Sequence, residues 1–122
     1  MAVRPGIAFM RFHGRKYHPW IVITSPIPAS GGVVCVNLTT LDEDCVDDKC
    51  ILSKADYAWI DDDHPTAVAF SYAQLYDVEK LGMTISKGLL KLANPTDIPA
   101  ATLTKTRLIA KTALDEDLRK YL

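Results

Sequence analysis

Two apolar runs separated by a turn-forming segment constrain the fold of this chain more than any other feature. The runs are Trp-Ile-Val-Ile-Thr at residues 20–24 and Val-Val-Cys-Val-Asn-Leu at residues 33–38, and β-branched side chains dominate both. Residues 25–32 between them are rich in Pro, Ser and Gly, which interrupt a strand and form turns. The pattern predicts two paired strands of a buried antiparallel sheet.

Further short apolar segments extend the β-rich pattern to about residue 78, and the rest of the chain has the spacing of helices. Helices are expected from Ile98 to Lys111 and from Thr112 onward, and the second would pack Leu114, Leu118 and Leu122 on the sheet. We predict one domain of mainly β, α+β class: an antiparallel β-barrel over residues 1–78 and a C-terminal helical extension over residues 79–122. The other expected strands cover residues 7–12, 50–52, 57–60, 66–72 and 73–78.

Charge and cysteine content narrow the classes of function. The formal net charge of the 122 residues is -1, so a nucleic-acid site must be a local patch rather than a basic surface. The N-terminal part supplies such a bias, because Arg4, Arg11, Arg15 and Lys16 precede the first acidic residue. Three cysteines, no signal-peptide pattern and no apolar run of ~18–20 residues predict a cytoplasmic protein with free thiols and no membrane partner.

Polar side chains flank the two central strands where chemistry is possible. His18 precedes the first strand, and Thr39 and Thr40 follow the second, so an antiparallel pair brings them to one rim of the sheet. A His exchanges protons near neutral pH, and a Thr hydroxyl binds phosphate or hydroxyl groups. Arg15 and Lys16 supply the positive charge that a phosphate needs, so these residues together suit metal-free cleavage of RNA, in which the 2′-hydroxyl of the RNA is the nucleophile. The alternative is a surface His beside two threonines that end a strand.

The same residues carry a resemblance to a known family. His18-Pro19 opening the first apolar run, and Leu38-Thr39-Thr40 closing the second, resemble the Arg-Pro and Thr-Ser elements of the PemK and MazF toxins. Residues 50–60 are similar to a segment of PemK-like proteins, in which Asp56 matches a family Asp. The resemblance covers residues 17 to about 81, roughly half of the chain.

The resemblance implies an SH3-like barrel, a homodimer, an antitoxin protein as partner and cleavage of single-stranded RNA. Thr39 matches the family Thr, whereas His18 stands where the family has Arg, which stabilises phosphate charge without giving up a proton. We therefore expect His18 and Thr39 as catalytic residues. A non-catalytic binding module acting on gyrase or an antitoxin is the alternative. The expected RNA-binding residues are Arg15, Lys16, Tyr17, Thr40 and Asp56.

Metal and cofactor sites have weaker support in the sequence. Cys45, Cys50 and His64 offer zinc ligands, but their spacing matches no compact zinc knuckle, so we predict neither metal nor cofactor. Trp20 and Trp59 lie in strand-like runs and are expected in the core or at a dimer contact, which leaves Tyr17 as the residue expected to stack on a base.

Overall fold

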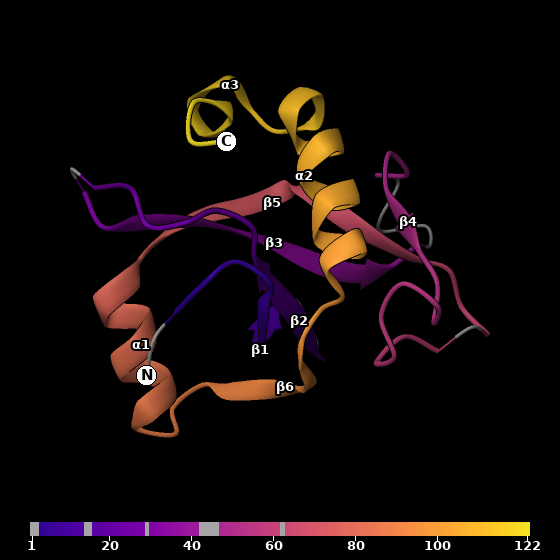
Figure 1. Cartoon of the computed structure of the whole chain (residues 1–122). Coiled ribbons are helices and arrows are strands. Elements are labelled where there is room, and N and C mark those ends of the chain that lie inside the picture. The colour runs from indigo at the N-terminus through magenta and orange to yellow at the C-terminus, as the bar shows by residue number, and fades with distance from the viewer. Residues whose placement is uncertain (1–2, 14–15, 29, 42–46, 62) are drawn as a thin grey trace.

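The structure is a computed structural model that describes residues 3–13, 16–28, 30–41, 47–61 and 63–122. The chain forms one antiparallel sheet and three helices in these residues (Figure 1). The strands are β1 (Ile7–His13), β2 (Lys16–Val22), β3 (Gly32–Thr40), β4 (Ile51–Leu52), β5 (Thr66–Asp77) and β6 (Lys91–Asp97). The helices are α1 (Val78–Ser86), α2 (Ala100–Ala113) and α3 (Glu116–Arg119).

The sheet has the strand order β4-β5-β3-β2-β1-β6 and curls into a half-barrel. β2 and β3 lie at its centre, with Trp20 opposite Asn37 and Val22 opposite Cys35. Both central strands have neighbours on each side and are covered on both faces, which explains why their apolar runs are nearly continuous rather than alternating. The predicted mainly β, antiparallel fold with C-terminal helices is confirmed.

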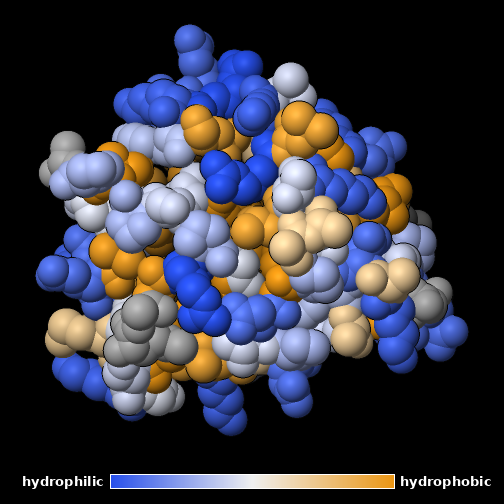
Figure 2. All heavy atoms as spheres, in the orientation of Figure 1, coloured by the Kyte–Doolittle hydropathy of each residue, from blue (hydrophilic) through white to orange (hydrophobic). Residues whose placement is uncertain are grey.

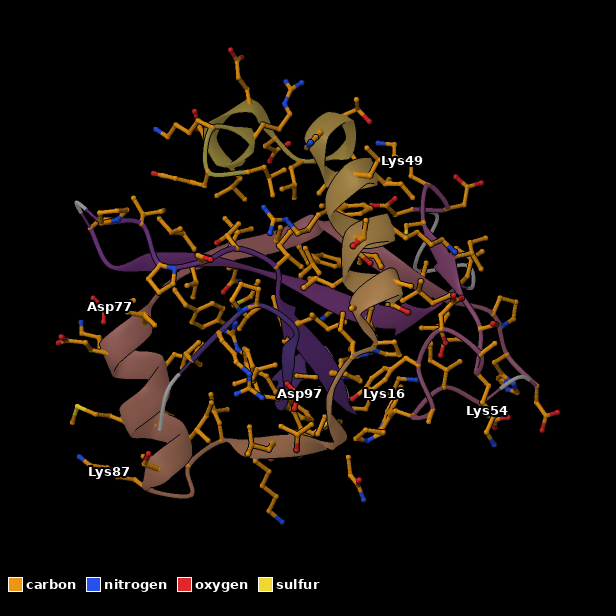
Figure 3. All side chains as sticks on the ribbon, viewed as in Figure 1. Lys16, Lys49, Lys54, Asp77, Lys87 and Asp97 are labelled. Atoms are coloured by element: carbon orange, nitrogen blue, oxygen red, sulfur yellow. The ribbon has the colours of Figure 1, made fainter. Side chains whose placement is uncertain are left out.

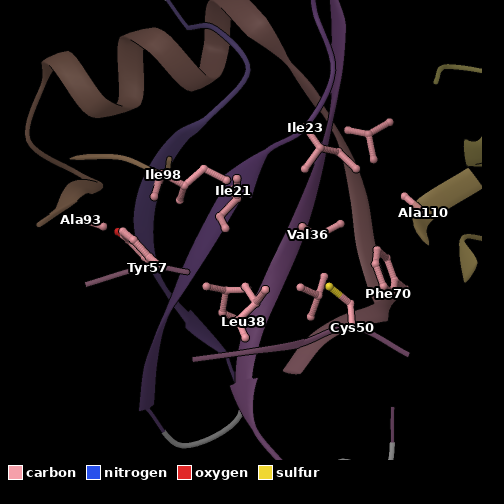
Figure 4. Close-up of a cluster of buried hydrophobic side chains, with 14 of the residues drawn as sticks. Ile21, Ile23, Val36, Leu38, Cys50, Tyr57, Phe70, Ala93, Ile98 and Ala110 are labelled. Carbon is pink, nitrogen blue, oxygen red and sulfur yellow. The ribbon is translucent and has the colours of Figure 1, made fainter. Parts of the chain in front are cut away.

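Each face of the sheet packs against its own helices. One face carries the larger core, which includes Ile21, Val36 and Phe70, and α2 adds Ala110 to it (Figure 4). Leu114 belongs to the same core, and the residues around α3 pack against it, as the leucine spacing predicts. The opposite face carries a smaller core of side chains from β1, β2, β3 and α1, namely Phe9, Trp20, Val22, Val33, Cys35, Leu81 and Ile85.

β5 is longer and less regular than the sequence suggests. The strands expected over residues 66–72 and 73–78 merge into one strand of 12 residues that ends at Asp77, and Val78 begins α1. Asn37 of β3 pairs with Ala69, but Cys35 pairs with Gln74, so β5 uses five residues where β3 uses two. Such an irregularity bends a strand and increases its twist, and here it helps the sheet to curl.

The C-terminal part contains two elements that differ from expectation. Residues 78–86 form α1, whose first turn is capped by Asp77 through the Lys80 amide, with N···Oδ1 of 2.9 Å; Asp77 and Lys87 mark the ends of this helix in Figure 3. β6 then pairs with β1, so the segment 79–122, expected as a helical extension, also supplies an edge strand. Asp97 ends β6 and binds Arg4, and α2 begins at Ala100 rather than Ile98.

Residues 53–60 form a series of turns, where the sequence predicts a strand over residues 57–60. Hydrogen bonds fix this segment to the rest of the protein. The Tyr57 hydroxyl donates to the Pro95 carbonyl at 2.5 Å, and the Thr102 hydroxyl donates to the Asp56 carbonyl at 2.6 Å. These anchors hold Trp59, which follows them in the chain, in a defined position beside the sheet.

The surface is mixed in character. Figure 2 shows hydrophobic residues in separate pieces among hydrophilic ones on the face turned to the viewer. Among the residues that the structure describes, none of the helices combines the length and hydropathy that a membrane crossing requires.

Candidate functional site

A hollow of about 180 Å³ lies at the rim of the sheet where β2 begins and β3 ends. β2 contributes its first three residues, β3 its last three, and β5 its first residue; the turn segment adds Trp59. Start and end of neighbouring antiparallel strands meet at one edge, which is why residues 20 positions apart share this hollow. The lining residues are Lys16, Tyr17, His18, Leu38, Thr39, Thr40, Trp59 and Thr66.

His18 is held at this rim by a hydrogen bond to the backbone. Its side chain is largely buried, with the residue 7% exposed, and Nδ1 lies 3.1 Å from the carbonyl oxygen of Leu38. A carbonyl oxygen only accepts, so Nδ1 carries the proton of this bond. In the neutral ring, Nε2 is then the nitrogen that can take up a proton, which is the arrangement a general base needs.

Three threonines line the hollow together with His18. Thr40 pairs with Thr66 across β3 and β5, and Thr39 pairs with Ala67 one step further along. The pairing of β2 with β3 reaches Trp20 opposite Asn37, and with this alternation Thr39 and His18 belong to the same face of the sheet. Hydroxyl groups both donate and accept hydrogen bonds, so this side of the hollow can hold phosphate oxygens or a sugar hydroxyl.

The charge and the aromatic surface of the hollow suit an anionic, planar ligand. Among the described lining residues, Lys16 carries the one permanent positive charge and none is a carboxylate. Tyr17 is 63% exposed and packs edge-on against Phe12, with ring centroids 5.4 Å apart; Trp59 is 39% exposed. In Figure 3, Lys16 lies on the side of the molecule that faces the loop carrying Lys54. Because Tyr17 and Trp59 are exposed, their rings border the hollow rather than fill the core.

The structure brings together five of the expected site residues: Lys16, Tyr17, His18, Thr39 and Thr40. Arg15 lies outside the described residues. Asp56 does not line the hollow; its Oδ2 accepts from the Ser53 amide at 2.9 Å and lies 3.8 Å from Lys105 Nζ. These contacts give Asp56 a role in shaping the turn segment and holding it to α2.

Sequence reasoning missed two lining residues, Trp59 and Thr66. The run around Trp59 reads as a strand and predicts a place in the core or at a dimer contact, but the residue lies at the hollow and is exposed. Trp20, for which the same was expected, is fully buried in the smaller core. Thr66 opens β5 opposite Thr40, and only the pairing of the strands could have indicated it.

The structure describes two of the three candidate zinc ligands, Cys50 and His64. Cys45 lies outside the described residues, and no cluster of three His, Cys, Asp or Glu side chains suited to a metal occurs within the described ranges. Cys50 is buried, and this burial raises the pKa of its thiol, a shift that the charge of Lys105 partly offsets. A protonated, buried thiol is a poor metal ligand.

Comparison with known proteins gave no assignment. No family model, curated protein or solved structure matches this chain.

Proposed function

We propose that this protein is the toxin of a type II toxin–antitoxin system and acts in the cytoplasm as a metal-independent endoribonuclease on single-stranded RNA. One observation carries the proposal: an imidazole with its proton on Nδ1 lines a hollow that also presents threonine hydroxyls and a lysine. This combination provides a base, hydrogen-bond donors and positive charge at one place, and cleavage of a phosphodiester bond needs these groups. The resemblance of residues 17–81 to the PemK and MazF toxins agrees with it.

The proposed reaction uses Nε2 of His18 as the base. Nε2 takes the proton of the RNA 2′-hydroxyl while the 2′-oxygen attacks the adjacent phosphorus. The bond from phosphorus to the 5′-oxygen breaks; that oxygen takes a proton from water, and the resulting hydroxide removes the proton held by His18. Thr39 and Thr40 bind the phosphate oxygens, and Lys16 offsets their charge. Because the 2′-oxygen is the nucleophile, the products carry a 2′,3′-cyclic phosphate and a 5′-hydroxyl.

The exposed rings favour unpaired RNA over a duplex. Tyr17 and Trp59 border the hollow and present aromatic surface to solvent. Bases can stack on such rings only when they are not stacked within a helix, and each stacked base contributes about 1–3 kcal/mol to binding. The substrate is therefore a loop or a single strand.

The cleavage is tested by incubating the purified protein with a long single-stranded RNA in a metal chelator. We expect fragments that end in a 2′,3′-cyclic phosphate, and no cut where a mapped cleavage position carries a 2′-deoxynucleotide. RNA that stays intact, or fragments with 5′-phosphate ends, would contradict the proposed chemistry.

The toxin assignment includes an antitoxin protein and a homodimer, as the family resemblance implies. Induced expression should stop growth, and a small protein encoded beside this gene should relieve the arrest and co-purify with it. Light scattering measures the assembly state of the purified chain. Unimpaired growth on induction would count against a toxin.

A second candidate is a non-catalytic binding module that acts on gyrase or an antitoxin. It is favoured by the low exposure of His18, 7%, and by its bond to the Leu38 carbonyl, both of which suit a structural histidine. Growth arrest with intact RNA and damaged DNA would select this function.

A further inference from the structure

A second cationic site lies next to the His18 hollow on the same sheet. Arg11 of β1 is the direct cross-strand partner of His18, and side chains of such partners lie about 4.5–5.5 Å apart at Cβ. The Arg11 guanidinium carbon lies 5.1 Å from the centre of the Trp20 ring and 5.5 Å from that of Tyr76. Two aromatic faces therefore hold the guanidinium in place on the face of the smaller core.

Within the described ranges, the Arg11 guanidinium has donors without a protein acceptor and forms no ion pair. Nη1 donates to Gln74 Oε1 at 2.7 Å and to the Tyr76 hydroxyl, which leaves the N–H groups of Nη2 and Nε for other partners. Both partners are uncharged, and within the described ranges the ion pairs of side chains are Arg4–Asp97 and Lys105–Asp56. Arg11 is half-buried and forms no ion pair with a described residue, so it attracts an anion, because its charge is incompletely screened by water.

Arg11 also lines a groove of about 460 Å³ between β5 and α1. Lys80 of α1 supplies a second cation there, and Thr84 supplies a hydroxyl. Among the described lining residues Asp77 is the one carboxylate, and it accepts the Lys80 backbone N–H as the cap of α1. The positive charge of the groove thus exceeds the negative charge, although the protein as a whole carries -1.

We propose that Arg11 and Lys80 form a binding subsite for a backbone phosphate of single-stranded RNA, next to the phosphate that is cut at His18. This inference rests on the proposed function and extends it, since it fixes the direction in which the RNA crosses the sheet. The strand leaves the rim hollow over β2 and β1 and enters the groove beside α1. A planar guanidinium offers two parallel N–H groups to phosphate oxygens, which a lysine cannot do.

Arg11 also has a structural role, because its cation–π contacts join β1 and β2 to β5. Loss of that role lowers stability but does not change how binding depends on salt. Release of one phosphate contact does change it: the slope of log K against log salt falls by about 0.7 for each contact to a single strand. The salt dependence therefore separates phosphate binding from support of the fold.

The experiment uses the full chain and a short, fluorescent 2′-O-methyl RNA, which cannot be cleaved because its 2′-oxygens carry methyl groups. Fluorescence anisotropy measures Kd at several salt concentrations for the native protein, Arg11→Gln, Lys80→Gln and the control Lys111→Gln. Lys80→Gln changes an exposed side chain and keeps the rings under Arg11 unaltered, so it tests the subsite even if Arg11→Gln unfolds. Lys111 lies on α2, which packs on the other face of the sheet.

We expect Arg11→Gln to weaken binding roughly 10-fold to 100-fold and Lys80→Gln less, each with a smaller salt slope, while Lys111→Gln behaves as the native protein. Native cleavage of RNA together with unchanged slopes in both groove variants would overturn the subsite alone. Binding that depends on Arg11 without any cleavage would support the subsite and overturn the nuclease. No binding of the probe by the native protein would overturn both.

Discussion

Replacing His18 by Asn separates its chemistry from its place in the fold. The side-chain nitrogen of Asn occupies nearly the position of Nδ1, so it can still donate to the Leu38 carbonyl, but Asn has no basic nitrogen. His18→Ala removes both the base and the hydrogen bond, whose length is 3.1 Å in the native protein. The pair of variants therefore measures the two roles independently.

The expected magnitudes follow from the geometry. Loss of the hydrogen bond costs ~0.5–1.5 kcal/mol, and the space left by an imidazole that is only 7% exposed adds to this in His18→Ala. We expect His18→Ala to lose about 2–4 kcal/mol of unfolding free energy and His18→Asn less than about 1 kcal/mol. Both should cleave RNA roughly 10²–10⁴-fold more slowly, because both lack the base.

Urea unfolding gives the stabilities, and single-turnover cleavage under saturating protein gives the rates. The reasoning is refuted if His18→Asn cleaves within tenfold of the native rate, since the imidazole would then not carry the proton. It is also refuted if His18→Ala is as stable as the native protein, since the bond to Leu38 would then contribute nothing.

Three further substitutions test other parts of the structure. Tyr57→Phe should lose about 1 kcal/mol at pH 7 with its bond to Pro95, and should flatten the fall in stability between pH 10 and 12. Burial, and secondarily the charge of Asp97, raise the pKa of Tyr57 to about 12, whereas this group ionises near pH 10 in the unfolded chain. Ionisation between these pH values therefore stabilises the unfolded state and lowers the free energy of unfolding of the native protein. Equal pH curves for the native protein and Tyr57→Phe would contradict this. Trp59→Ala should weaken binding of single-stranded RNA by about 1–3 kcal/mol in fluorescence anisotropy, and Trp59→Phe by less; equal affinities would exclude stacking there. Thr24→Val leaves a buried amide without its acceptor and should cost about 1–3 kcal/mol in urea unfolding, unlike Thr24→Ser, and no difference between the two would reject that bond.

The central strands and the rim they share were accessible from sequence because local pattern and tertiary structure agree there. The runs at residues 20–24 and 33–38 are β-branched and the turn between them carries Pro and Gly, and the two strands pair as expected. Since antiparallel pairing fixes which strand ends meet, it also indicates that residues flanking the runs lie together.

The elements after residue 78 were harder to foresee for two different reasons. α1 has helix signals in its sequence, an N-cap Asp77 and Glu79 in the first turn, but the apolar residues before it read as a continuing strand. β6 has no strand signal, because Ala, Asn, Pro and Asp have low β propensity. Its pairing with β1 is decided by tertiary contacts, and these are not visible in a single sequence.

The groove beside α1 shows a further limit of sequence reasoning. Arg11 lies two residues after Phe9 on β1, so the sequence indicates that both side chains share one face of the sheet. Its neighbours Gln74 and Tyr76, however, lie more than 60 positions away in the chain. Nothing local indicates that β5 returns over Trp20. A cluster built from distant strands needs the structure to be found.

The excess length in β5 also sets which way its side chains point. Val68 and Phe70 face the larger core, and strict alternation would send Tyr76 to the same side. Between two paired positions β5 advances by five residues while β3 advances by two, and this odd difference inverts the alternation of side chains in β5. Tyr76 therefore contacts Trp20 on the opposite face, with ring centroids 6.3 Å apart. A deletion within residues 71–73 that shifted the pairing of residues 74–77 by one position would turn this ring to the other face, away from the guanidinium. The number of residues in that segment, more than their identity, thus decides whether the arginine has its aromatic support.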